Sequence, residues 1–198
     1  MREQLASLAL ERFVTLDALD APHVCPPGAA ERLHERWGLP VLPPPHLMWW
    51  DASDDRRTYH GWEETRALLA QKLKSEAPVG LLGFSQGAMV AAAAAALSAQ
   101  GELPPVRFVV CIGGRTPRAD ALAPAFARPL EVPSLHAWGE RDPLAKAHAP
   151  DLADHFAPEF RELCVWRGSH SVPTRGPAAD AIVDFVRRHA EPQPPSYV

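Results

Sequence analysis

Hydrophobic residues along this chain follow two patterns: short unbroken apolar runs, and longer segments in which apolar positions recur every three or four residues. Unbroken runs of this length are typical of parallel strands that are covered on both faces. The run at residues 106–112 is the clearest case, and further strands are predicted at residues 79–84, 130–138 and 160–166, with a short one at 13–16. The helical spacing predicts helices at residues 3–12, 29–36, 62–76, 86–97, 147–156 and 176–189. Strands that alternate with helices predict an α/β fold with a doubly wound sheet.

The length of 198 residues suits a single domain, which we place at residues 1–190. Prolines break regular elements between about residues 21 and 60, and we expect this segment to form a flap on the domain. Trp49, Trp50 and Trp62 favour a folded flap over a mobile linker. The proline-rich residues 191–198 are expected to form a flexible tail.

The charge balance gives no sign of a nucleic-acid or membrane partner. Twenty Lys and Arg residues against 24 Asp and Glu residues give a net charge of −4, without the basic footprint that such partners require. The longest apolar run, at residues 88–97, is too short to span a bilayer, and the first residues lack the apolar core of a secretion signal. The three cysteines are far apart and odd in number, which fits a reducing compartment. These features favour a cytoplasmic protein.

Ser85 lies between Gly83 and Gly87 at the junction of a predicted strand and a predicted helix. The G-x-S-x-G pattern is typical of a nucleophilic serine held on a sharp strand-to-helix turn. We expect glycine at both flanking positions because a side chain there would collide with neighbouring backbone. The turn would place the hydroxyl at the positive end of the helix, with the N–H of Gln86 as one donor to an oxyanion. The pentapeptide alone fits equally well a glycine-rich turn whose serine caps the helix.

Two loops after predicted strands carry the partners that a nucleophilic serine requires, a base and a carboxylate that orients the base. Asp142 follows the strand at 130–138, and His170 follows the strand at 160–166. Both belong at the carboxyl edge of the sheet, where Ser85 is also expected. The order Ser85, Asp142, His170 is that of the α/β-hydrolases. Glu140 competes with Asp142 for the acidic role, and ordinary turn or loop roles remain alternatives for both partners.

The histidines of the chain show no metal-ligand spacing, so we expect neither a metal nor a cofactor.

Three motifs together resemble the FSH family of small serine hydrolases. They are Leu82-Gly83-Phe84-Ser85-Gln86-Gly87-Ala88, the segment Pro133-Ser134-Leu135-His136 that leads into Gly139-x-x-Asp142, and Gly168-Ser169-His170-x-Val172-Pro173. The segment Asp17-Ala18-x-x-Ala21-Pro22-His23 and the pair Trp49-Trp50 also match that family. The resemblance extends over nearly the whole chain from residue 3. It implies an α/β-hydrolase fold and cleavage of carboxylic esters or thioesters, with Ser85, Asp142 and His170 as the catalytic triad.

The chain departs from the family pattern at three places. Ser169 replaces a second glycine, and Leu47 stands where an arginine usually precedes the aromatic pair. The family's first strand and its His-Gly loop, which supplies the second oxyanion N–H, have no counterpart in this sequence, which is therefore expected to be truncated at its N-terminus relative to the family. The start of the chain could lie further upstream, another segment or a second chain could fill the position, or the domain could be a weak or inactive scaffold.

These arguments predict a serine hydrolase whose acyl substrate, a small molecule or a carrier-linked ester, lies against Trp49 and Trp50. Core packing is the structural alternative for both tryptophans. The competing function is a binding or interaction protein that keeps the fold without a complete oxyanion hole. A homodimer formed through the unfilled sheet position is a further expectation.

Overall fold

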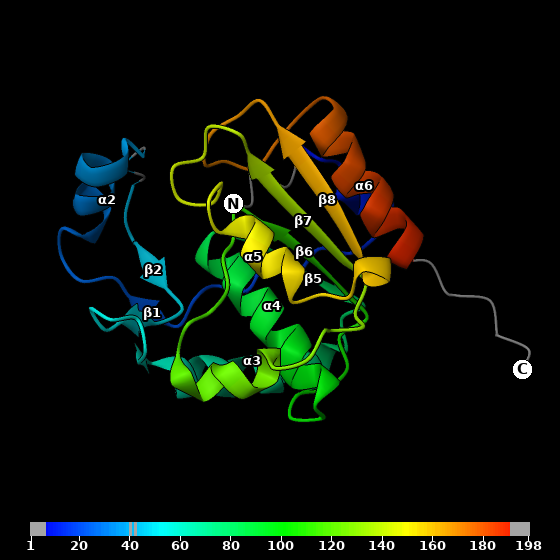
Figure 1. Cartoon of the computed structure of the whole chain (residues 1–198), viewed down its shortest axis with the longest axis horizontal. Helices are drawn as coiled ribbons and strands as arrows, with labels where there is room; N and C mark the ends of the chain where they lie inside the picture. Colours follow the sequence, from blue (N-terminus) through cyan, green and yellow to red (C-terminus); the bar gives the residue numbers. More distant parts are fainter. Residues whose placement is uncertain (1–6, 40, 42, 191–198) are drawn as a thin grey trace, which may run out of the picture.

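The computed structural model describes residues 7–39, 41 and 43–190. Its centre is a parallel sheet of four strands in the order β5-β6-β7-β8 (Figure 1). The strands are β5 (Gly80–Phe84), β6 (Phe108–Ile112), β7 (Ser134–Gly139) and β8 (Arg161–Trp166). All four carboxyl ends lie at the same edge of the sheet because the strands are parallel. The predicted α/β class is confirmed, as are the four long predicted strands, with boundaries shifted by a few residues.

Helices cover both faces of this sheet (Figure 1). The helices α4 (Gln86–Ala99) and α5 (Ala149–Asp154) pack on one face, and α3 (Trp62–Glu76) joins the same core. The helix α6 (Pro177–Ala190) and the 3₁₀ turn η1 (Leu10–Arg12) cover the other face. A second 3₁₀ segment, η2 (Asp120–Phe126), packs beside α4, and a third, η3 (Pro158–Phe160), leads into β8.

The central strand β6 shows why both faces must be covered. All five of its residues are buried, and successive side chains point to opposite faces of the sheet. Val109 and Cys111 enter the core beneath α4, whereas Phe108, Val110 and Ile112 enter the core beneath α6. An unbroken apolar run is therefore the sequence that this position requires.

The helix α4 lies close against the sheet because its side chains are small. Residues 88–97 are all buried, and seven of these ten are alanines. Small side chains on every side of a helix let its backbone approach the strands below and the neighbouring helices. The first turn of α4 is thereby fixed relative to β5 and β6, and Ser85 directly precedes that turn.

Residues 21–60 form a set of short elements beside the sheet (Figure 1). The strand β1 (His23–Val24) pairs with β2 (Leu47–Met48), β3 (Asp51–Ala52) pairs with β4 (Tyr59–His60), and α2 (Ala29–Trp37) lies between the two members of the first pair along the chain. Trp50 anchors the segment, since its ring stacks on Tyr59 at 4.5 Å and meets Trp62 edge-on at 5.6 Å. We refer to residues 21–60 as the flap.

The predicted strand at 13–16 is wrong. These residues belong to no strand, and Phe13 and Leu16 are 46% and 37% exposed. Among the described residues the segment pairs with no strand, and the outer edge of β5 also stays unpaired.

The two ends of the chain are only partly described. Residues 3–6 of the predicted first helix and the predicted tail at 191–198 lie outside the described residues. The rest of that helix contains only η1, and the helix predicted at 147–156 is shorter, comprising the six residues of α5. Within residues 7–39, 41 and 43–190, no helix has the length and apolar character needed to cross a membrane.

His136 is a fully buried histidine of β7, on the face that packs against Phe156. Its Nε2 lies 3.1 Å from the hydroxyl of Ser134, and its Nδ1 has no hydrogen-bond partner among the described residues. Burial lowers the pKa of His136 to about 3, and the charge of Arg161 acts in the same direction. The folded protein therefore keeps this ring neutral, whereas the unfolded chain protonates it near pH 6.5.

We expect protonation of His136 to destabilise the fold as the pH falls. The pKa of His136 is lower in the folded protein than in the unfolded chain. The resulting loss in the free energy of unfolding is therefore absent above about pH 6.5 and grows to about 2 kcal/mol by pH 5. Urea denaturation between pH 7 and pH 5 should show this loss in the wild type and a flatter profile in His136→Gln. The exposed His60 supplies the matched control His60→Gln, which should keep the wild-type profile. Equal pH profiles for the wild type and His136→Gln would contradict the prediction.

Candidate active site

Ser85 occupies a strained turn between β5 and α4. Its φ of 56° and ψ of −117° are values that non-glycine residues rarely adopt. The N–H of Ser85 donates to the carbonyl of Ile112 at 2.8 Å, which ties the turn to the neighbouring strand. A Cβ placed on Gly83 would lie 2.1 Å from the carbonyl oxygen of Gly87, so the tight turn closes only with glycine at position 83. The predicted collision is thus confirmed at Gly83.

The same prediction is wrong for Gly87. A Cβ at this position would meet only the indole Nε1 of Trp49 at 3.7 Å, an ordinary van der Waals contact. The backbone of Gly87 is helical and directs its missing side chain outward, toward the flap, rather than into the turn.

The loops after β7 and β8 are held together by backbone contacts. A Cβ on Gly139 would lie 2.4 Å from the carbonyl oxygen of Gly168, so glycine is needed for the two strand ends to approach. The N–H of Glu140 donates to Trp166, and the N–H of Arg141 donates to Gly168. This approach places Asp142 on the first loop beside His170 on the second.

Ser85, His170 and Asp142 form a continuous chain of hydrogen bonds. The Nδ1 of His170 lies 2.7 Å from Oδ2 of Asp142, and its Nε2 lies 2.9 Å from Oγ of Ser85. A carboxylate only accepts hydrogen bonds, so Nδ1 carries the proton and Nε2 is free to accept from the serine hydroxyl. The side chains of His170 and Asp142 are 5% and 1% exposed, whereas the competing Glu140 is exposed.

Asp142 is held as a carboxylate by its hydrogen bonds. Burial alone would raise its pKa, but the hydrogen bond and charge of His170 and the N–H groups of Ala145 and Leu144 together bring the pKa below its ordinary value. Those two N–H groups donate to Oδ1 at 2.9 and 2.8 Å. One oxygen is thus bound to the loop backbone, and the other faces the imidazole.

Gly113 is a residue of this site that the sequence argument did not identify. It follows β6 with a φ of 60°, and a Cβ there would lie 3.2 Å from the ring of His170 and 3.4 Å from Oδ2 of Asp142. A side chain would press on both groups. The pair Gly113-Gly114 directly after a buried strand was the signal that could have revealed it.

The side chain of Gln86 joins the nucleophile turn to the flap, a role that the sequence did not indicate. Its Oε1 accepts from the backbone N–H of Trp49 at 2.8 Å, and its Nε2 donates to the carbonyl of Trp50 at 2.9 Å. The hydroxyl of Thr65 on α3 donates to the carbonyl of Trp49. The flap backbone is therefore bound from both α4 and α3 at the point where it passes Ser85.

The two tryptophans proposed to contact substrate differ in position. Trp50 is 3% exposed and packs in the core, the structural alternative left open by the sequence, so it has little surface to offer a substrate. Trp49 is half-buried, with its indole against the first turn of α4 beside Gly87. We retain only Trp49 as a candidate for substrate contact.

The backbone N–H of Gln86 stands at the first position of α4, where a helix has no internal acceptor for it. No strand pairs with the outer edge of β5 in the part of the chain that the structure describes, so the second oxyanion donor implied by the resemblance has no counterpart there. Nor do these residues contain a group of three or more His, Cys, Asp or Glu side chains that could hold a metal ion.

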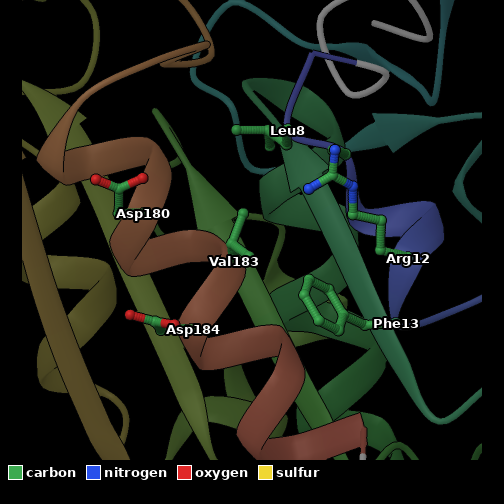
Figure 2. A pocket seen from close by; sticks show the side chains of 7 residues that line it. Leu8, Arg12, Phe13, Asp180, Val183 and Asp184 are labelled. Carbon is green, nitrogen blue, oxygen red and sulfur yellow. The ribbon is translucent and has the colours of Figure 1, made fainter.

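A separate hollow of about 340 Å³ lies between η1 and α6, away from Ser85. Figure 2 shows Arg12 and Phe13 on one side and Asp180 and Asp184 of α6 on the other. None of its lining residues is a serine, cysteine or histidine, so it does not contain the groups of a serine-histidine nucleophile.

Comparisons with known proteins identify the family. A family model described as serine hydrolase (FSH1) matches residues 1–182. Esterase OVCA2 of Homo sapiens is 30% identical over 207 residues, a match that covers 96% of this chain and 90% of the human protein. An esterase of Anopheles gambiae is 30% identical over 190 residues, covering 90% of this chain and 67% of that protein.

Solved structures give the class of the fold. Acyl-protein thioesterase 2 of Zea mays aligns with a TM-score of 0.57 at 19% identity over 74% of each chain. Esterase PE8 aligns with a TM-score of 0.57 at 20% identity over 86% of this chain and 76% of that structure. The fold is that of the α/β-hydrolases. Within this class, the chain belongs to the FSH1 family of serine hydrolases.

The two glycines around Ser85 should respond differently to substitution. Gly83→Ala should lower the free energy of unfolding by about 1–3 kcal/mol, because the added methyl group meets backbone that cannot move without distorting the turn. Gly87→Ala should leave it unchanged or raise it by up to about 1 kcal/mol, since alanine favours the helix and has room. Urea denaturation of both variants measures the difference. A Gly87→Ala variant as unstable as Gly83→Ala would contradict this account.

Proposed function

We propose that this protein hydrolyses carboxylic esters or thioesters through an acyl-enzyme intermediate on Ser85. The observation that carries the proposal is the hydrogen-bonded chain from Ser85 through His170 to Asp142, with distances of 2.9 and 2.7 Å. A base within hydrogen-bond reach of a serine, itself oriented by a buried carboxylate, is the arrangement that activates a nucleophile.

In the proposed reaction His170 acts first as base and then as acid. Its Nε2 takes the proton of Ser85 as Oγ attacks the acyl carbonyl, and the same proton then passes to the leaving alcohol or thiol. Water deacylates the enzyme by the same route, which returns the proton to the imidazole and then to Ser85. Asp142 stabilises the imidazolium formed in both halves, and its lowered pKa keeps it charged near neutral pH.

The oxyanion is assigned to the N-terminus of α4. The N–H of Gln86 has no acceptor within the helix and lies next to the nucleophile, where the helix dipole also favours negative charge. The side-chain amide of Gln86 is already bound to the flap, so the backbone N–H is the group we assign as donor.

The relatives support the proposed substrate class. The relatives reported above are esterases, and one of the structures reported above is an acyl-protein thioesterase. We propose an acyl ester or thioester, free or attached to a carrier, whose acyl part lies against Trp49. The free cysteines Cys25, Cys111 and Cys164 suit a reducing compartment, and we propose a cytoplasmic location on that ground.

A binding protein without catalysis is the competing function, since only one oxyanion donor can be assigned among the described residues. The buried, hydrogen-bonded state of His170 and Asp142 favours the enzyme, because a binding role requires neither the strained serine nor an imidazole aligned with it.

Reaction of the purified chain with a fluorophosphonate probe should give one adduct, located at Ser85 by mass spectrometry. Ser85→Ala should abolish both labelling and ester hydrolysis. Asp142→Asn should lower kcat by about 10³–10⁴-fold, because the amide no longer holds the required imidazole tautomer.

The exposed neighbour Glu140 provides the matched control, since Glu140→Gln should keep wild-type kcat and labelling. A folded wild-type chain that neither reacts with the probe nor turns over esters and thioesters would favour the binding protein. Labelling at a residue other than Ser85 would overturn the assignment of the nucleophile.

We further propose that a second copy of the chain pairs with the outer edge of β5. This strand, Gly80–Phe84, has no charged residue or proline to protect its edge. The opposite edge strand, β8, carries charges engaged in ion pairs, Arg161 with Asp154 and Glu162 with Arg188. Open apolar edges favour pairing, whereas charged edges resist it.

Sedimentation velocity from about 1 to 100 μM protein should show a monomer–dimer equilibrium. Leu163→Glu, on the exposed face of β8, should leave this equilibrium unchanged. A concentration-independent monomer would refute the dimer, and loss of association in Leu163→Glu would move the interface to β8.

A further inference from the structure

Three arginines lie on segments that adjoin the candidate site. Arg115 and Arg118 belong to the loop that leaves the carboxyl end of β6, and Arg56 lies in the turn between β3 and β4. Arg56 and Arg115 are half-buried, and Arg118 is exposed. None of the three side chains forms an ion pair or a hydrogen bond with another described residue.

Contacts between the turn and the loop bring these arginines together. The hydroxyl of Tyr59 accepts from the backbone N–H of Arg118 at 2.8 Å. The carbonyl of Arg57 accepts from the N–H of Asp120 at 2.9 Å, and the guanidinium of Arg57 pairs with the carboxylate of Asp120 at 2.7 Å. Arg56 is held in its turn with a φ of 62°, an uncommon value for a residue with a side chain.

The same loop begins at the catalytic groups. Gly113 lies against His170 and Asp142, and Gly114 lies against Ala88 in the first turn of α4. Arg115 is two residues beyond Gly113, a chain distance of about 7 Å at most. Its guanidinium is therefore carried by a segment that is in contact with both the His170 side and the Ser85 side of the site.

Two carboxylates beside the cluster, Asp120 and Asp55, are already bound. Asp120 pairs with Arg57, and Asp55 accepts from the hydroxyl of Ser53 at 2.7 Å and from the N–H of Arg57 at 3.0 Å. Burial lowers the pKa of Arg115, and the nearby charge of Arg56 lowers it further; Tyr59 acts in the opposite direction, and Arg118 adds the smallest lowering effect. Positive charge thus accumulates here in a protein whose net charge is −4.

Thr116, in the same loop, carries an unsatisfied polar group. Its hydroxyl oxygen is buried and has no hydrogen-bond partner among the described residues, although it adjoins Arg115 in the chain. A buried hydroxyl without a partner is unfavourable unless a ligand or solvent molecule completes its hydrogen bonds.

We propose that Arg56, Arg115 and Arg118 bind an anionic group of the substrate, so that the preferred esters or thioesters carry a phosphate or carboxylate. Guanidinium groups bind both anions through paired N–H donors. This inference rests on the proposed hydrolase function, because it assigns a substrate class to the same site.

Three thioesters test the inference and locate the anion. Butyryl-coenzyme A carries phosphates in its leaving group, the succinyl thioester of N-acetylcysteamine carries a carboxylate in its acyl group, and the butyryl thioester of N-acetylcysteamine is neutral. The wild type should favour at least one anionic substrate over the neutral one by tenfold or more in kcat/KM. Arg115→Gln should lower that ratio by about ten- to a hundredfold, and Arg115→Lys should retain part of it.

Arg128→Gln removes an exposed arginine after η2 and controls for the change in overall charge; it should keep the wild-type ratio. The substrate whose advantage disappears in Arg115→Gln identifies the position of the anion. Equal ratios in the wild type and Arg115→Gln would overturn the proposal. If Arg115→Gln fails to fold in thermal melts, Arg56→Gln and Arg118→Gln take its place. Each should lower the kcat/KM ratio of the anionic to the neutral substrate severalfold or more.

Binding separates this inference from the hydrolase proposal. In a Ser85→Ala background, calorimetry should show that the preferred anionic thioester binds at least tenfold more tightly than the neutral one, and that adding Arg115→Gln removes the difference. Absence of turnover in the wild type would defeat the hydrolase proposal alone, since binding still decides anion recognition. Equal binding of all three compounds to Ser85→Ala would defeat the anion site even in an active hydrolase.

Discussion

The backbone conformation of Ser85 is the constraint on which the rest of the site depends. A non-glycine residue with positive φ costs on the order of 1–3 kcal/mol and persists only when its surroundings enforce it. Here the enforcement comes from the close contact of Gly83 with the backbone of Gly87 and from the hydrogen bond to Ile112. The packing of the alanine-rich α4 against β5 and β6 then fixes the direction in which the serine hydroxyl points.

The base and the carboxylate meet the serine because three loops approach without intervening side chains. Gly139 and Gly168 allow the ends of β7 and β8 to touch, and Gly113 leaves room for the imidazole beside β6. The parallel sheet supplies the other half of the arrangement, since it delivers all these loops to one edge. The site therefore depends on the absence of side chains at these glycines as much as on the positions of its polar side chains.

The sequence predicted the parts of this structure that local patterns determine. An apolar run located β6, because a strand covered on both faces requires such a run, and the need for glycine at position 83 followed from the spacing around Ser85. The segment at 13–16 carries a similar apolar pattern yet forms no strand, because a strand also needs a neighbour, and no local pattern contains that information. The side chain of Gln86 was missed for a related reason: its partners lie 36 and 37 residues away in the chain.

The contacts of Gln86 have a consequence for how this protein can diversify. Its amide binds only backbone atoms at Trp49 and Trp50, so the tie does not depend on which side chains the flap carries. The intervening segment with α2 can change in length and composition while the two anchored peptide groups stay in place. Such a flap is an exchangeable module: new substrate preferences can arise there without disturbing the turn that holds the nucleophile.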